Sequence, residues 1–222
     1  NNYFLLKNGT INADFAFQNN KRKEFADATN PDEKELFFDL NTFNYNVRYN
    51  VKETNNWETS FGIGGMQQSN TNKGVEALIP DYQFFDAGAF VFTQKTFNKN
   101  LTLAGGLRFD NRNVDAQEML EDADVKFTKF NKNYSGISGS LGLSYQLDKQ
   151  STIKLNLSRG FRAPNIAELS SNGIHEGTFR YEIGDINLKS EISHQIDAAY
   201  FLNSDHISFE FTPFVNFISN YI

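Results

Sequence analysis

The chain has 222 residues, a formal net charge of −6 and no cysteine, which excludes disulfide bonds and thiolate metal sites. The acidic balance argues against a nucleic-acid partner, because such binding needs clustered lysine and arginine side chains. Mean hydropathy is −0.52, and no apolar run approaches the roughly 18 residues of a membrane-spanning helix.

Long segments that alternate apolar and polar residues follow one another along the chain, which predicts β-strands. The first four full segments are 11–25, 36–51, 57–70 and 83–97. Alternation is clearest in the later segments 101–110, 137–147, 152–158, 192–202 and 207–217. With a strand at the start of the chain, about ten strands are expected. Alternation does not assign the phenylalanines between residues 84 and 92 to a face.

The connections between these segments are alternately short and long. Tight polar turns are expected at 7–9, 52–56, 98–100, 148–150 and 203–205, and long loops at 26–35, 71–82, 114–133 and 162–191. This alternation is typical of a transmembrane barrel, which has tight turns at one rim and ligand-facing loops at the other. The predicted fold class is therefore an all-β, antiparallel, up-and-down transmembrane β-barrel, present in part, in the outer membrane of a Gram-negative bacterium.

The two ends of the chain both fall within expected strands. Ten strands that do not close a barrel would leave two unpaired edges in lipid, which is energetically unfavourable. The start of the chain also has no recognisable signal peptide, although an outer-membrane protein is exported. We therefore expect the chain to be an excerpt of a longer protein.

The most specific motif is the segment 158–169, which reads Ser-Arg-Gly-Phe-Arg-Ala-Pro-Asn-Ile-Ala-Glu-Leu. It resembles a motif in the C-terminal part of the barrel of TonB-dependent outer-membrane receptors. The resemblance continues through 177–182 and to 187–191, where these receptors usually read Asn-Pro-Asn-Leu-Lys-Pro-Glu. Here Asp185-Ile186 replaces the first Asn-Pro pair and Ser190 replaces the second proline. The resemblance covers nearly the whole chain.

The resemblance implies an active importer of a ferric siderophore or a similar scarce nutrient. Residues 1–222 would be part of the barrel domain, and the plug domain and TonB box of such receptors are absent from the sequence. The implied partners are outer-membrane lipid and lipopolysaccharide, the TonB complex acting through the plug, and a small solute. No resident cofactor is implied, and a metal site is left unassigned.

The resemblance also points to ligand-binding residues, namely His175, Arg162 and Tyr181. In some haem receptors a histidine in the loop after the Phe-Arg-Ala-Pro box is an axial iron ligand, and His175 occupies such a loop. The plainer interpretation of His175 is a solvated loop histidine. The plainer interpretation of Arg159 and Arg162 is a structural role, in which their side chains pair with acids such as Glu168 or with the plug domain.

Two other classes of function remain as alternatives. An enzyme would need a convergent acid, base or nucleophile, and the sequence has no nucleophile elbow, phosphate loop or paired metal-ligand spacing, so no enzyme is expected. A secreted carbohydrate-binding β-sandwich would use exposed aromatic residues as stacking platforms. Most segments are longer than the strands of five or six residues that such a sandwich favours.

Overall fold

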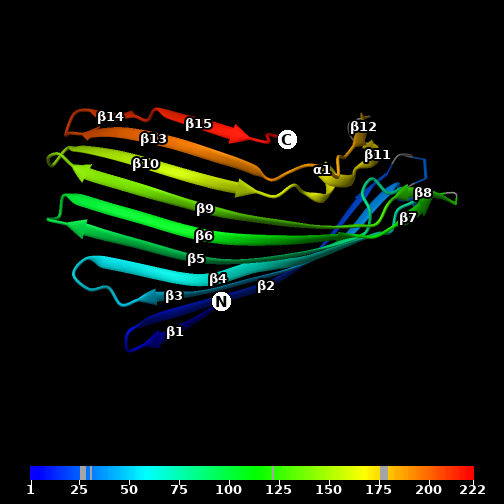
Figure 1. The fold of residues 1–222 in the computed structure, drawn as a ribbon, viewed down its shortest axis with the longest axis horizontal. Coiled ribbons are helices and arrows are strands. Elements are labelled where there is room, and N and C mark those ends of the chain that lie inside the picture. Colours follow the sequence, from blue (N-terminus) through cyan, green and yellow to red (C-terminus); the bar gives the residue numbers. More distant parts are fainter. Residues whose placement is uncertain (26–28, 31, 122, 176–179) are drawn as a thin grey trace.

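The computed structural model describes residues 1–25, 29–30, 32–121, 123–175 and 180–222. This part of the chain forms one antiparallel sheet of 11 strands and two small sheets of two strands each (Figure 1). In the large sheet each strand pairs with the next, except that the last two strands both pair with the strand before them. The strands of this sheet are β1 (Asn2–Leu6), β2 (Gly9–Glu24), β3 (Leu36–Val51), β4 (Trp57–Asn72), β5 (Tyr82–Phe97), β6 (Leu101–Ala116), β9 (Phe130–Gln146), β10 (Ser151–Arg162), β13 (Glu191–Asn203), β14 (Ser208–Phe211) and β15 (Phe214–Ser219). The predicted antiparallel up-and-down wall is confirmed, and it is open, as expected of a partial barrel.

The open sheet has β1 at one edge and the pair β14 and β15 at the other. Both β14 and β15 pair with β13, and Pro213 separates them. Proline has no N–H to donate to a ladder, so the strand is interrupted there, although the Pro213 carbonyl still accepts from the Ala198 N–H at 3.0 Å. The segment predicted as one strand at 207–217 is thus two strands in one line. Among the described residues, no helix has the length and apolarity needed to cross a membrane.

Alternation along the strands divides the sheet into two faces, because paired residues of an antiparallel ladder point to the same side. We call one the apolar face. On it Leu107 pairs with Val91, and Leu157 pairs with both Leu141 and Ile196. The opposite, polar face carries the residues between them, such as Arg108, Asp110, Ser138, Ser140, Asn156 and Ser158. Leu107 is 62% exposed and Leu141 is 66% exposed, so this surface requires an apolar environment.

The phenylalanines between residues 84 and 92 occupy both faces. Phe85 lies on the apolar face, whereas Phe84 and Phe90 lie on the polar face. There the Arg112 guanidinium carbon lies 4.9 Å from the centre of the Phe84 ring, and that of Arg108 lies 5.9 Å from the Phe90 ring. These aromatic rings therefore pack under cationic groups on the polar face, which explains why simple alternation fails in this segment.

The two ends of the strands differ as predicted, with tight turns at one end and longer connections at the other (Figure 1). Asn55, Asn56, Asn98 and Lys99 in the tight turns have positive φ values of 47° to 65°. Asparagine tolerates this left-handed conformation better than most residues. The long-loop end also holds small elements that the sequence analysis did not predict: β7 (Met119–Glu121), β8 (Asp124–Phe127), α1 (Ile166–Ser170), β11 (Asn172–His175) and β12 (Arg180–Ile183).

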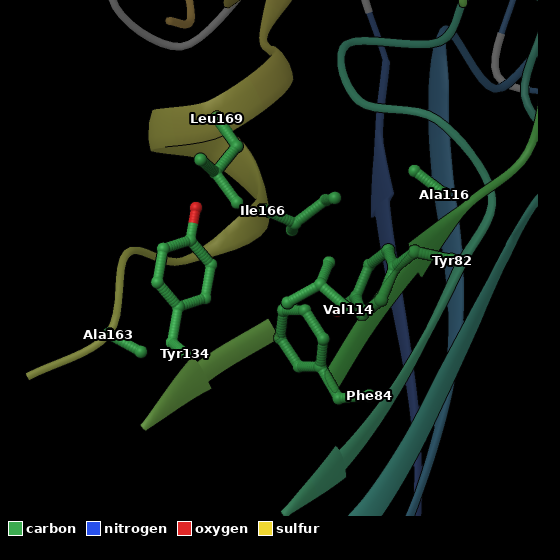
Figure 2. Close-up of a cluster of buried hydrophobic side chains, with 8 residues drawn as sticks. All are labelled: Tyr82, Phe84, Val114, Ala116, Tyr134, Ala163, Ile166 and Leu169. Carbon is green, nitrogen blue, oxygen red and sulfur yellow. The ribbon is translucent and has the colours of Figure 1, made fainter. Parts of the chain in front are cut away.

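The main hydrophobic core lies on the polar face at the long-loop end, beneath α1 (Figure 2). Ile166 and Leu169 of α1 are 6% and 2% exposed, and Val114 of β6 is fully buried. The other members of the cluster are Tyr82, Phe84, Ala116, Tyr134 and Ala163. The loop that follows β10 thus folds back over the polar face of the sheet instead of extending away from its end.

Candidate functional site

Arg162, a predicted ligand-binding residue, anchors the loop that follows β10. Its Nη1 lies 2.9 Å from Glu168 Oε1, and its Nε lies 2.7 Å from Glu191 Oε2 at the start of β13. Glu168 also completes a capping box on α1, because its carboxylate accepts from the Asn165 N–H at 2.8 Å and its own N–H donates to Asn165 Oδ1 at 2.9 Å. The expected pairing of Arg162 with Glu168 is confirmed, and Arg162 links the strand end to the helix.

Arg159, the other arginine of the motif, has a different environment. It donates to the backbone carbonyl of Ile137. Within the described residues no carboxylate forms an ion pair with Arg159, so the expected acidic partner is not found there.

The ion pair of Arg162 with Glu191 lies at the long-loop end, beyond the continuous apolar face, and makes the loop anchor sensitive to acid. The Arg162 guanidinium, together with the N–H of Ile222, lowers the pKa of Glu191 to about 2. A depressed carboxyl pKa stabilises the folded state fully above the ordinary value of about 4.5, and this stabilisation is lost as the pH falls from 4.5 towards 2.

We therefore expect the unfolding midpoint in urea to fall more steeply between pH 5 and pH 2.5 for the parent protein than for Glu191→Gln. Urea unfolding followed at several pH values measures this difference. If the urea midpoints of the two proteins fall equally as the pH is lowered, Glu191 is not the group that causes the acid sensitivity.

Further charged pairs continue along the polar face below the loop. Arg112 binds Asp86 through two hydrogen bonds of 2.7 and 2.6 Å, and Arg108 binds Asp110 at 2.7 and 2.8 Å. These four side chains and Arg162 line a cavity of about 400 Å³. Each arginine already has a carboxylate partner, so the cavity is a fixed polar wall with little net charge and not a strongly cationic anion site.

A second cavity, of about 690 Å³, lies among the long loops, and we call it the loop cavity. It is lined by residues from three connections: Val75, Glu76, Glu121, Asp124, Val125, Lys126, Asn172, Gly173, Ile174 and Tyr181. Carboxylates, an ammonium group and a phenol give this cavity both donors and acceptors for a polar solute. Within the described part of the chain, no group of three or more histidine, aspartate or glutamate side chains is placed to hold a metal ion.

Asn172 ties the three connections together. Its backbone N–H donates to the Leu78 carbonyl at 3.0 Å, and its side-chain amide donates to the Lys126 carbonyl at 3.0 Å. Its Oδ1 accepts from the Tyr181 hydroxyl at 2.7 Å. Lys126 in turn lies 2.5 Å from Glu121 across the β7–β8 hairpin. One amide therefore connects the loop before β5, the hairpin after β6 and the loop after β10.

The three predicted ligand-binding residues do not meet in one cavity. Tyr181 lines the loop cavity, whereas Arg162 lines the cavity on the polar face. The backbone of His175 lies at the end of β11, paired in register with Arg180, and its side chain falls outside the described residues. The prediction for His175 as a ligand is therefore not tested, and neither are the ligand roles of Arg162 and Tyr181.

The sequence analysis missed Asn172 and the acidic residues of the β7–β8 hairpin. Asn172 lies just after Ser171, which caps the end of α1, at a position where an asparagine could equally be a turn residue. The hairpin residues Glu121 and Asp124 lie in a polar loop whose composition does not distinguish a cavity lining from a solvated surface. Only the folded arrangement of the three loops reveals that these residues face one another.

Known proteins resemble this chain in sequence. Residues 1–222 match the family model described as TonB dependent receptor-like, beta-barrel. A curated relative, the TonB-dependent heme receptor A of Haemophilus influenzae (strain 86-028NP), is 23% identical over 192 residues, covering 78% of this chain and 25% of that protein.

Two solved structures share the fold. The copper transporter OprC has a TM-score of 0.71 at 18% identity, with 96% of this chain and 35% of that chain covered. The FrpB iron transporter of Neisseria meningitidis (F5-1 variant, apoprotein form) has a TM-score of 0.68 at 14% identity, with 96% and 35% covered. The chain thus spans a quarter of the length of the curated relative and about a third of each of these structures. Since the family model covers every residue and these transporters contain the same wall of long antiparallel strands, the chain belongs to the TonB-dependent receptor β-barrel family.

Proposed function

We propose that this chain is a section of the barrel of an outer-membrane receptor that imports a ferric siderophore or a similar scarce nutrient with energy from TonB. The observation that carries the proposal is the docked loop after β10, which covers the polar face of the wall and helps to form the loop cavity. A passive pore needs an open lumen, whereas a receptor needs loops that hold a solute above its channel.

The cavity of about 400 Å³ on the polar face of the sheet supports the same proposal. Paired arginine and aspartate side chains, such as Arg112 with Asp86, present a fixed hydrogen-bonding surface to the interior of the barrel. Such a surface suits contact with a plug domain or with a hydrated solute. In this proposal residues 1–222 belong to the barrel domain, while the plug and TonB box lie elsewhere in the receptor, and the receptor resides in the outer membrane of a Gram-negative bacterium.

Two of the three relatives named above favour iron as the element transported, although OprC is a copper transporter. FrpB is an iron transporter, and the relative from Haemophilus influenzae is a haem receptor. Haem is the second candidate solute, with His175 as an axial ligand, because His175 lies on β11, whose neighbouring residues Gly173 and Ile174 line the loop cavity.

The test uses the full-length receptor that contains this chain, expressed in an iron-starved Gram-negative strain that lacks its own ferric-siderophore and haem receptors. We expect growth on at least one ferric siderophore, and we expect deletion of the tonB gene to abolish that growth. Growth on haem alone, together with a Soret band that shifts in the His175→Ala variant, would favour the haem receptor. No TonB-dependent growth on any iron source would contradict iron uptake.

A further inference from the structure

The lining of the loop cavity has an excess of negative charge. Of the described side chains around it, Glu76, Glu121 and Asp124 are acidic, and Lys126 is the one that is basic. The Lys126 ammonium lies 2.5 Å from Glu121 and its side chain is largely buried, so its charge is already neutralised. Among the described residues no basic side chain forms an ion pair with Glu76 or Asp124. These two carboxylates are therefore free to bind a cationic group of a solute.

An aromatic ring in the same lining also suits a cation. Tyr181 lines the loop cavity and is exposed, and its hydroxyl donates to Asn172 Oδ1 at 2.7 Å. This hydrogen bond restrains the ring, because Asn172 is itself bonded to the Leu78 and Lys126 carbonyls. The face of a tyrosine ring attracts an ammonium group, most strongly where water is excluded. The ring and the two free carboxylates thus favour the same kind of ligand group.

The sequence around the cavity extends this negative field. The long connections at this end of the sheet, 25–35, 73–81, 117–129 and 163–190, each contain more acidic than basic residues. The tight turns at the opposite end have no such acidic excess. A mouth with one sign of charge raises the local concentration of oppositely charged solutes and repels those of its own sign. A cationic solute is therefore favoured before it makes contact, and an anionic one is disfavoured.

We propose that the loop cavity selects a solute that carries a protonated amine, which binds the carboxylates of Glu76 and Asp124 beside the ring of Tyr181. The inference rests on the proposed function and deepens it by naming a class of siderophore. A ferric hydroxamate chelate with a free ammonium group fits this lining. A ferric tris-catecholate chelate, which is an anion, does not.

The experiment compares two ligands that differ in one charge. Ferrioxamine B is a ferric hydroxamate with a free ammonium group, and its N-acetyl derivative is the same chelate without that charge. Isothermal titration calorimetry measures the binding of each to the detergent-purified full-length receptor. At low ionic strength we expect the cationic chelate to bind about tenfold more tightly than the N-acetyl derivative. Added salt is expected to reduce this difference, because it screens the charges.

The double variant Glu76→Gln/Asp124→Asn is expected to remove the difference and to bind both chelates as the parent binds the N-acetyl derivative. Glu118→Gln is the matched control. Glu118 is an exposed acid in the same connection as Asp124, but it does not line the loop cavity. This variant is expected to keep the parent's preference for the cationic chelate. Heat-modifiable migration in gels verifies that each variant is folded.

Two results would overturn the inference and leave the proposed siderophore receptor intact. One is binding of both hydroxamate chelates with equal affinity by the parent, or an unchanged preference in the double variant. The other is tight binding of a ferric tris-catecholate chelate together with no binding of ferrioxamine B. If the receptor binds none of these ferric chelates, the proposed siderophore import and the inference both fail.

Discussion

Leu155→Lys is expected to lower the free energy of unfolding of the full-length receptor in lipid vesicles by about 2–4 kcal/mol, the cost of a lysine near the middle of a lipid-facing barrel wall. Leu155 lies on the apolar face of β10, 49% exposed, between Leu143 of β9 and Ala198 of β13. In lipid, a lysine there must either lose its hydration or extend to the headgroups. Equilibrium unfolding in guanidinium chloride measures the change.

The adjacent residue provides the control, because successive residues of a strand point to opposite faces. Asn156 lies on the polar face and donates to Asp197 Oδ2 at 3.2 Å. Asn156→Lys places the same new charge beside a carboxylate and is expected to change the free energy of unfolding by less than about 1 kcal/mol. Equal destabilisation by both lysines would show that the apolar face does not contact lipid.

Leu169→Ala is expected to release the loop after β10 from the polar face. Leu169 is 2% exposed in the cluster with Val114 and Tyr134, and truncating such a leucine costs about 2–5 kcal/mol. Because this side chain packs α1 against the sheet, the lost packing free energy destabilises the docked state of the loop. Hydrogen exchange of the Ser171 amide, which donates to the Ala167 carbonyl at 2.9 Å, is expected to accelerate roughly 30-fold or more.

Ile183→Ala is the matched control for this measurement. Ile183 belongs to the same loop and also loses an aliphatic side chain, but it is 80% exposed. Its exchange rates are expected to stay near those of the parent. Acceleration in both variants, or in neither, would contradict the idea that burial of Leu169 holds the loop.

The strands were largely predictable from sequence, but β6 ends at Ala116 and β9 begins at Phe130, so both extend into the loop predicted at 114–133. Within β5 the alternation itself fails, and that failure has a physical cause. Alternation predicted 36–51, the observed limits of β3, and came within one or two residues for β2, β4 and β5. It works because one face meets an apolar medium while the other meets water. It fails at Phe84, since α1 packs on the polar face at that level, and at Phe90, whose ring lies on the polar face under the Arg108 guanidinium.

The loop elements were less predictable because their stability comes from contacts that are distant in sequence. The Asn165 and Glu168 spacing is a capping-box signal, but α1 has only five residues and is too short to form without the sheet beneath it. Tyr181 was identified from the family resemblance alone. Its hydrogen bond to Asn172, across β11 and β12, depends on the folded hairpin.

The position of Asn172 has a mechanical consequence. The side-chain amide and backbone N–H of this one residue form hydrogen bonds that join the loop before β5, the β7–β8 hairpin and the loop after β10. None of these three connections can therefore move away alone without breaking a hydrogen bond. We therefore expect thermal motion of these three connections to be concerted, so that in the proposed receptor a solute that immobilises one of them would immobilise the others as well.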